Sequence, residues 1–104
     1  NPMSALLSVM GACQTIIAFM FAKQNGIELN HFSVEIEGDM DMNAIMKQER
    51  GKTGFQEIRY KMIFDSPNSD EELMAFGELI EELCPVSQSL KKETKIVNTG
   101  LKRK

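Results

Sequence analysis

The residues MSALLSVMGACQTIIAFMFAKQN, positions 3–25, decide the fold of this chain. No charged residue occurs from Met3 through Ala22. The bulky apolar side chains do not gather on one stripe, so a helix built from this segment is apolar nearly all round. Such a helix is either surrounded by protein or placed in a membrane. We expect the rest of the chain to cover it.

A membrane span is the main alternative, because about 20 apolar residues are enough to cross a bilayer. Against it, the segment includes Ser4, Ser8, Gln14 and Thr15, and it has neither a basic cluster ahead of it nor an aromatic belt at its ends. It also lacks the charged start of a signal peptide. The sequence therefore favours a helix buried in protein and no membrane partner.

The length of the chain bears on how that helix is covered. With 104 residues, we expect one domain spanning positions 1–104. A domain of this size buries only about two-thirds of its unfolded surface, which is little cover for a helix that is apolar on every side. A second copy would supply the missing cover, so we expect an obligate homodimer.

Composition excludes several classes of protein. The net charge is −3, and the only basic cluster is the tail Lys102-Arg103-Lys104, so a nucleic-acid partner is not expected. Two cysteines far apart do not make a secreted disulfide scaffold. With His31 as the single histidine, neither a metal site nor another cofactor is expected. The composition is that of an ordinary intracellular protein, and we expect a cytoplasmic location.

The remainder of the chain shows strand and helix patterns in turn. Alternating apolar and polar residues predict two strands with long connections, and Ser69 with Glu72 forms a capping box ahead of an amphipathic helix. That helix is expected to bury Leu73, Phe76, Leu79, Ile80 and Leu83 and to expose Glu78, Glu81 and Glu82. The expected segments are strands 29–39 and 54–65, a mobile connection 40–53 with one helical turn, helices 70–83 and 85–91, and a last strand 94–98.

The two cysteines occupy different settings. Pro85 suits a first helical position, which puts Cys84 at a helix N-terminus, where a thiolate is stabilised. Cys13 lies in the middle of the apolar helix, where burial raises the pKa of a thiol. The small residues Gly11 and Ala12 leave room for another element to approach Cys13. From residue types alone, each cysteine can equally be an inert core residue.

Three motifs resemble those of one known family. They are Asn1-Pro2 ahead of Leu6-Leu7, GAC at positions 11–13 and CPVSQSL at positions 84–90, and the likeness includes KQNGIEL at positions 23–29. On these residues the chain is similar to the OsmC/Ohr family of peroxide-stress proteins over nearly its whole length.

The resemblance implies an α+β, OsmC-like fold: an intertwined dimer whose central helix is buried between mixed or antiparallel sheets, with the active site at the subunit boundary. It also implies a thiol-dependent peroxidase that acts on organic or inorganic hydroperoxides in oxidative stress defence. Cys13 matches the family's peroxide-attacking cysteine and Cys84 its resolving cysteine. Their disulfide would be reset by an external dithiol. The residues that contact substrate are left unassigned.

The chain departs from the family pattern at two places. Typical hydroperoxide reductases have Glu after the Asn-Pro pair, and Met3 stands there in this chain. They also use an Arg from N-terminal strands, and no such strands stand ahead of Asn1 in this sequence: either they belong to a longer chain, or the protein is a shortened, divergent member. Within the chain, Arg50 is the better candidate to replace it, since Arg59 is expected to face away from the core. The alternative function is a non-catalytic OsmC-like dimer that binds an apolar small molecule between its subunits.

Overall fold

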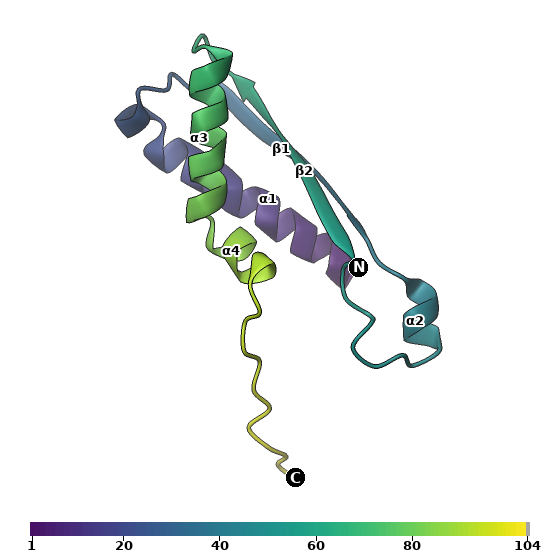
Figure 1. Ribbon diagram of the computed structural model, residues 1–104. Helices are drawn as coiled ribbons and strands as arrows, with labels where there is room; N and C mark the ends of the chain where they lie inside the picture. The colour runs from purple at the N-terminus through teal and green to yellow at the C-terminus, as the bar shows by residue number, and fades with distance from the viewer. Residues whose placement is uncertain (104) are drawn as a thin grey trace.

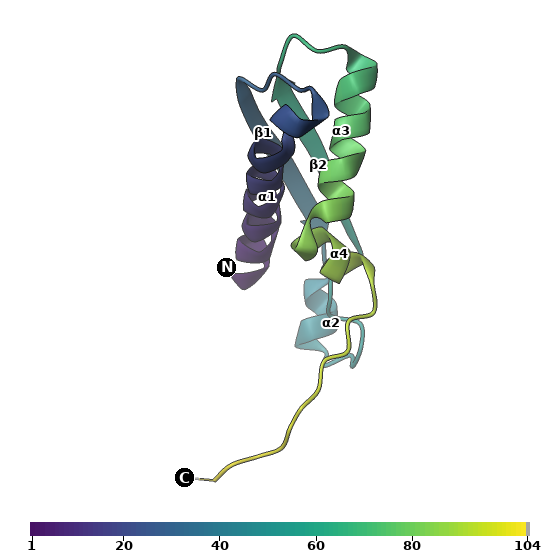
Figure 2. The same ribbon diagram turned by 90° about the vertical axis from the view of Figure 1, so that its left-hand side faces the viewer.

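A two-stranded antiparallel sheet carries the main helices on one face (Figure 1). The computed structural model describes residues 1–103. Its elements are α1 (Pro2–Phe21), a 3₁₀ turn η1 (Lys23–Asn25), β1 (His31–Asp39), α2 (Met42–Met46), β2 (Glu57–Asp65), α3 (Asp70–Leu83) and α4 (Pro85–Lys91). Seen from the side, α1 and α3 lie next to each other over the sheet, and α4 follows below α3 (Figure 2). The predicted α+β class is confirmed.

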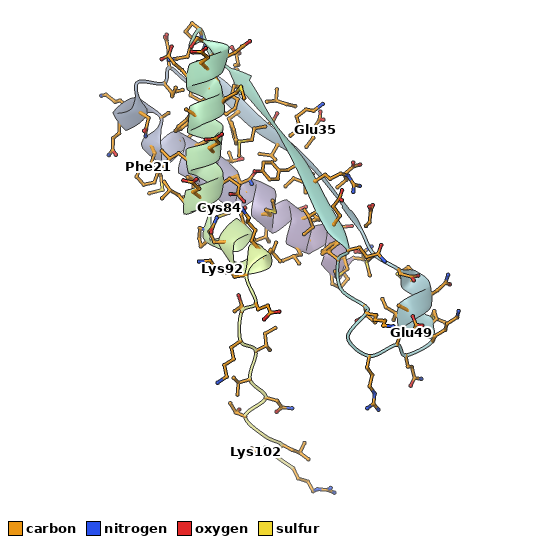
Figure 3. The ribbon with its side chains drawn as sticks, in the orientation of Figure 1. Phe21, Glu35, Glu49, Cys84, Lys92 and Lys102 are labelled. Atoms are coloured by element: carbon orange, nitrogen blue, oxygen red, sulfur yellow. The ribbon has the colours of Figure 1, made fainter. Side chains whose placement is uncertain are left out.

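The two strands have the predicted alternation of apolar and polar sides. They pair along their whole length, with His31 opposite Asp65 at one end and Asp39 opposite Glu57 at the other. The even-numbered positions face the helices, and the rings of Phe32 and Phe64 meet edge to face there with centroids 5.2 Å apart. The opposite face is polar, as Glu35 shows (Figure 3). One side of the sheet therefore forms the floor of the core.

Helix α1 crosses this floor but is covered on one side only. Asn1 caps its start by accepting a hydrogen bond from the Ser4 N–H, and Ala18 enters the core with Phe76 and Ile80 of α3. Val9, Ile16, Phe19 and Met20 are more than half exposed on the uncovered side. The expected cover on every side is therefore not reached within one chain.

The length and composition of α1 would also suit a membrane span. Its mean hydropathy is 1.8, a value that the buried central helix of a protein core also reaches. The packing of one side of α1 on β1 and α3 is that of a core helix. That the other side is covered by a second copy, rather than by lipid, stays a prediction.

Helix α3 confirms most of its sequence pattern. Ser69 and Glu72 form the predicted capping box, and Phe76 and Ile80 are buried. Two details differ from the expectation. Leu83 is exposed, because α3 ends there and turns away from α1, whereas Glu81 is largely covered because α4 folds back over it and Lys91 pairs with its carboxylate.

The last predicted strand is wrong. Residues 94–98 form no strand in the described part of the chain, and the segment after α4 runs away from the body of the molecule (Figure 1). A strand needs a partner edge, and this segment runs away from both outer edges of the β1–β2 sheet (Figure 1). Ile96 is consequently 94% exposed.

Candidate active site

The fold brings the two cysteines together. Cys84 lies where α3 ends and α4 begins, beside α1 (Figure 3). Cys13 lies in the middle of α1, each of the two cysteines shifts the pKa of the other, and both are free thiols. Gly11 does not provide the room for this approach, because it faces β1, where an added Cβ would lie 3.2 Å from Ile36 Cδ1. The contact between α1 and α4 instead takes place on the side of α1 that carries Cys13 and Gln14.

Cys84 has the surroundings of a stabilised thiolate. It is completely buried, and as the N-cap of α4 its sulfur accepts a hydrogen bond from the Ser87 N–H at 3.5 Å. Burial by itself acts to raise the pKa of Cys84. Hydrogen bonds from the Ser87 side chain and N–H, from the Cys13 thiol and from the Val86 N–H outweigh it, so the pKa of Cys84 lies below its ordinary value.

Cys13 has the opposite balance. Burial raises the pKa of Cys13, the hydrogen bond with Cys84 and the negative charge there raise it further, and only the Val86 N–H acts against them. Cys13 is nevertheless the more accessible of the two thiols, since it is half-buried. The pair therefore consists of an accessible Cys13 whose pKa is raised and a buried Cys84 whose pKa is lowered. These directions agree with what the helix positions predicted.

Neither Arg50 nor Arg59 lies near the thiols. Arg59 faces away from the core, as predicted, and pairs on the outer face of the sheet with Glu37 at 2.9 Å, Asp39 at 2.8 Å and Glu57 at 2.7 Å. Its hydrogen bond to Asp39 lowers the pKa of that carboxyl. Arg50 is exposed in the connection between α2 and β2. Within residues 1–103, no cation is among the groups that shift the pKa of Cys13.

A groove of about 700 Å³ lies next to the thiol pair. Two of its lining residues adjoin the cysteines: Met10 is one turn ahead of Cys13 on α1, and Ser87 donates to Cys84. Most of the other lining side chains are apolar. They come from α1 (Met3, Leu6), from residues 54–60 (Phe55, Ile58, Tyr60) and from α4 (Leu90), with Glu57, Glu81 and Lys91 among the polar residues. The site can thus receive a molecule with an apolar body.

Two polar groups near the thiols were not expected from the sequence. The pKa of Tyr60 is raised by burial first, and then by the negative charges of Glu81 and Cys84, which places its hydroxyl close to both. Glu81 is held by Lys91 at 3.3 Å. Tyr60 had been read as an ordinary inward strand residue and Glu81 as part of an exposed helix face. No sequence signal distinguishes either residue, since the groove joins β2, α3 and α4.

The sequence also did not predict a buried contact next to Cys13. Gln14, the neighbour of Cys13, donates a hydrogen bond through Nε2 to the Ser87 hydroxyl at 3.3 Å. Both side chains are buried. A signal for Gln14 did exist, because it is the longest polar side chain in an otherwise apolar helix. Residues 1–103 hold no group of three or more His, Cys, Asp or Glu side chains that could bind a metal ion.

Comparison with known proteins supports this description of the fold. The family described as "OsmC-like protein" matches residues 1–98. Two curated relatives named "Hydroperoxide reductase", from Mycoplasma pneumoniae and Mycoplasma genitalium, are each 29% identical over 90 residues, which are 86% of this chain and 61% of theirs. The chain therefore spans about three-fifths of the length of these relatives.

Solved structures show the same fold. The OsmC-like protein of Mycoplasma pneumoniae superimposes with a TM-score of 0.80 at 28% identity, covering 89% of this chain and 63% of the other. An OsmC-like hydroperoxide resistance protein from Jannaschia superimposes with a TM-score of 0.73 over 92% of this chain and 63% of the other. At 19% identity, the second likeness speaks for the fold alone.

Proposed function

The chain belongs to the OsmC-like protein family, and from that premise we propose that it is a thiol-dependent hydroperoxide reductase acting in oxidative stress defence. One observation carries the proposal: two free thiols, 71 positions apart in sequence, lie near enough to shift each other's pKa, next to residues that line a largely apolar groove. The names of the relatives, hydroperoxide reductase, point to the same substrate class. The mechanism below is part of the proposal.

In the first step, Cys13 attacks the hydroperoxide. Its greater exposure supports this role, because a fully buried Cys84 gives a peroxide no approach. The Cys13 thiol first gives its proton to solvent. The Cys13 thiolate then forms a bond to the outer peroxide oxygen as the O–O bond breaks. The leaving alkoxide takes a proton from solvent and departs as the alcohol, and Cys13 becomes a sulfenic acid.

In the second step, Cys84 resolves the sulfenic acid. Its thiolate attacks the Cys13 sulfur, an S–S bond forms, and the sulfenic oxygen leaves as hydroxide, which takes a proton from solvent to become water. For this bond to form, the two side chains have to reach disulfide geometry, with Cα atoms within about 7 Å. An external dithiol then reduces the disulfide by exchange and restores both thiols.

The groove supports organic hydroperoxides as substrates. Its lining from α1 and from residues 54–60 is largely apolar and would hold a hydrocarbon body, with the peroxide group directed at Cys13. Met3 takes part in this lining where typical family members have Glu. Met3 itself offers no group that could take the Cys13 proton.

We further propose that the protein works as a cytoplasmic homodimer. The exposed residues Val9, Ile16, Phe19 and Met20 form an apolar strip along α1 that a second copy would cover. A monomeric soluble protein rarely leaves such a strip in water. Cytoplasmic thiols are kept reduced, as this reaction requires.

Peroxide consumption in the presence of dihydrolipoamide tests the proposal. We expect Cys13→Ser to abolish turnover, and Cys84→Ser to consume about one equivalent and stop at the sulfenic or, with excess peroxide, the sulfinic acid. One equivalent of peroxide should convert the unchanged protein to a Cys13–Cys84 disulfide, with the loss of two hydrogens seen by mass spectrometry. Turnover by Cys13→Ser but not by Cys84→Ser would reverse the two roles.

A second candidate function is binding without chemistry. It is favoured by the groove itself, whose wall includes Met3 in place of an acid, so that it presents a mainly apolar surface to a ligand. In this case the protein is an OsmC-like dimer that holds an apolar small molecule. The same assay separates the two functions, because saturable binding of a hydroperoxide with no loss of peroxide in any variant supports binding alone.

A further inference from the structure

We propose that the ring of Phe55 closes one end of the groove and thereby limits the chain length of the hydroperoxide that the protein accepts. The inference deepens the proposed function and rests on it for the identity of the ligand. It names the substrate class as organic hydroperoxides with a short apolar body. Phe55 is then a specificity-determining residue that takes no part in the transfer of oxygen or protons.

The groove extends along the first half of α1. Met10, one turn ahead of Cys13, lines it near the thiols, and Met3 lines it at the start of the helix. The helix rises by about 10 Å between these two methionines. The start of α1 lies beside the end of the sheet from which the chain leads to α2, and residues 54–58 line the groove there (Figure 1). An apolar chain whose peroxide group lies at Cys13 therefore extends along α1 toward Phe55.

The ring of Phe55 is seated on the inner face of the sheet. Gly38 pairs with Ile58, and Ile58 lines the groove. A Cβ added at Gly38 would lie 2.7 Å from Cε1 and 2.9 Å from Cδ1 of Phe55. Carbon atoms in contact lie about 3.5–4.0 Å apart, so the ring occupies the space that a side chain at position 38 would need. Glycine at this position thus allows the ring to lie against the strand at this end of the groove.

A second hollow borders the same ring. Its volume is about 400 Å³, and we call it the α2 hollow because its lining includes Ala44 of α2, together with the charged residues Asp41, Glu49 and Lys52. Residues 54–56 line both the groove and the α2 hollow. Of these three residues, Phe55 is half-buried while Gly54 and Gln56 are exposed, so the ring is the side chain packed between the two spaces. Removing the ring should join them.

The ring limits chain length because the two spaces differ in polarity. Burying an apolar chain strengthens binding by about fourfold for each added methylene. The groove offers largely apolar walls as far as Phe55, whereas three charged side chains line the α2 hollow beyond it. A chain longer than the groove has to turn out into water or displace the ring, so its further methylenes add no affinity. We call the chain length at which affinity stops rising the cutoff.

The experiment measures the binding of straight-chain primary alcohols, the reduction products of the corresponding hydroperoxides, to the full chain with both cysteines reduced. Tyr60 lines the groove, and it is the only tyrosine of a chain without tryptophan, so its fluorescence reports occupancy of the groove. Alcohols do not react with thiols, and the measurement therefore needs no peroxidase activity. In the unchanged protein, affinity should rise about fourfold per methylene up to the cutoff and then level off.

Variants at the two ends of one contact should move the cutoff in opposite directions. Phe55→Ala should shift it to a longer alcohol and strengthen the binding of alcohols just beyond the original cutoff by about tenfold, as two further methylenes become buried. Phe55→Leu keeps a smaller apolar side chain and should give a smaller shift in the same direction. Gly38→Ala pushes the ring into the groove and should shift the cutoff to a shorter alcohol. In a Phe55→Ala background, Gly38→Ala should cause no shift.

Leu6→Ala is the matched control, because Leu6 lies between Met3 and Met10 on α1 and also lines the groove. It should weaken the binding of all alcohols near the cutoff by a similar factor and leave the cutoff unchanged. An unmoved cutoff in both Phe55 variants would overturn the proposal, and so would the failure of every alcohol to bind. A protein that shows the expected cutoffs but consumes no hydroperoxide retains the role of Phe55 and loses the proposed function. Turnover of hydroperoxides with an unmoved cutoff has the reverse meaning.

Discussion

Replacing Gly38 by alanine should drive an aromatic ring away from the sheet and into the groove. Gly38 is on the inner face of β1, and an added Cβ would lie 2.7 Å from Cε1 and 2.9 Å from Cδ1 of Phe55. Since carbon atoms in contact lie about 3.5–4.0 Å apart, the ring has to move by about 1 Å. The obstacle is a side chain on a connecting loop, so part of the strain can relax.

The expected loss of stability follows from that geometry. Overpacking destabilises by about 1–3 kcal/mol, and the mobile loop places this case toward the lower end, at about 1–2 kcal/mol. For a domain of this size, that corresponds to a fall in melting temperature of about 5–15 °C. Gly38 has no left-handed backbone conformation, so the effect is one of contact alone. Thermal unfolding followed by circular dichroism measures it.

The chain offers a matched control for this change. Gly54 lies directly before Phe55 and lines the same groove, yet an added Cβ there meets nothing within 4 Å. Gly54→Ala should therefore leave the melting temperature unchanged or raise it slightly. In a Phe55→Leu background the loss caused by Gly38→Ala should shrink, since the ring is gone. If Gly38→Ala is as stable as the unchanged protein, or is equally harmful without the ring, the packing described for Phe55 is incorrect.

Three further predictions concern the core, the dimer and the thiols. Ile80→Val removes one methylene from a fully buried side chain and should lower the free energy of unfolding by about 1 kcal/mol. Ile63→Val, at a site 42% exposed, should lower it much less. Equal changes in melting temperature would contradict the assignment of Ile80 to the core. Sedimentation at micromolar concentration should give about twice the chain mass of 11.7 kDa, and Ile16→Lys should weaken the dimer while Ile63→Lys on the opposite side of the sheet should not. Because the pKa of Cys13 is raised, the rate of its alkylation by iodoacetamide should increase about tenfold per pH unit, up to a midpoint above that of a free cysteine. Cys84→Ala removes two of the causes that raise the pKa of Cys13, so it should speed alkylation at neutral pH. A slower reaction would contradict the described contact.

The sequence predicts those elements whose signals are local. Apolar alternation located β1 and β2, and the boundaries of α3 and α4 followed from Ser69 and Pro85, because capping and the missing proline N–H act within one helical turn. The prediction of a strand around Ile96 was wrong because strand formation also depends on contacts far away in sequence. The composition of this segment suits a strand, but pairing depends on an edge elsewhere in space, which composition cannot reveal.

The candidate active site likewise has some features that the sequence predicts and others that it does not. The N-terminal position of Cys84 and the apolar setting of Cys13 indicated the directions of their pKa shifts, since both are properties of the residue's own helix. Contacts between helices could not be predicted from the sequence. Ser87 meets Gln14 across 73 positions of sequence, and the nearness of Tyr60 to Cys84 depends on how α4 folds back toward β2. No periodicity encodes such contacts.

Helix α1 links the assembly of the protein to its chemistry. Successive residues of an α-helix are about 100° apart, so Val9, Ile16 and Met20 lie within about 40° of one another on its exposed side. On the same wheel Cys13 lies about 40° from Val9, between the exposed strip and the buried Gln14. A second copy that covers the strip therefore also borders the open side of Cys13. The apolar residues that make α1 unsuited to water in a single chain are thus placed to complete the wall of the thiol site in a dimer.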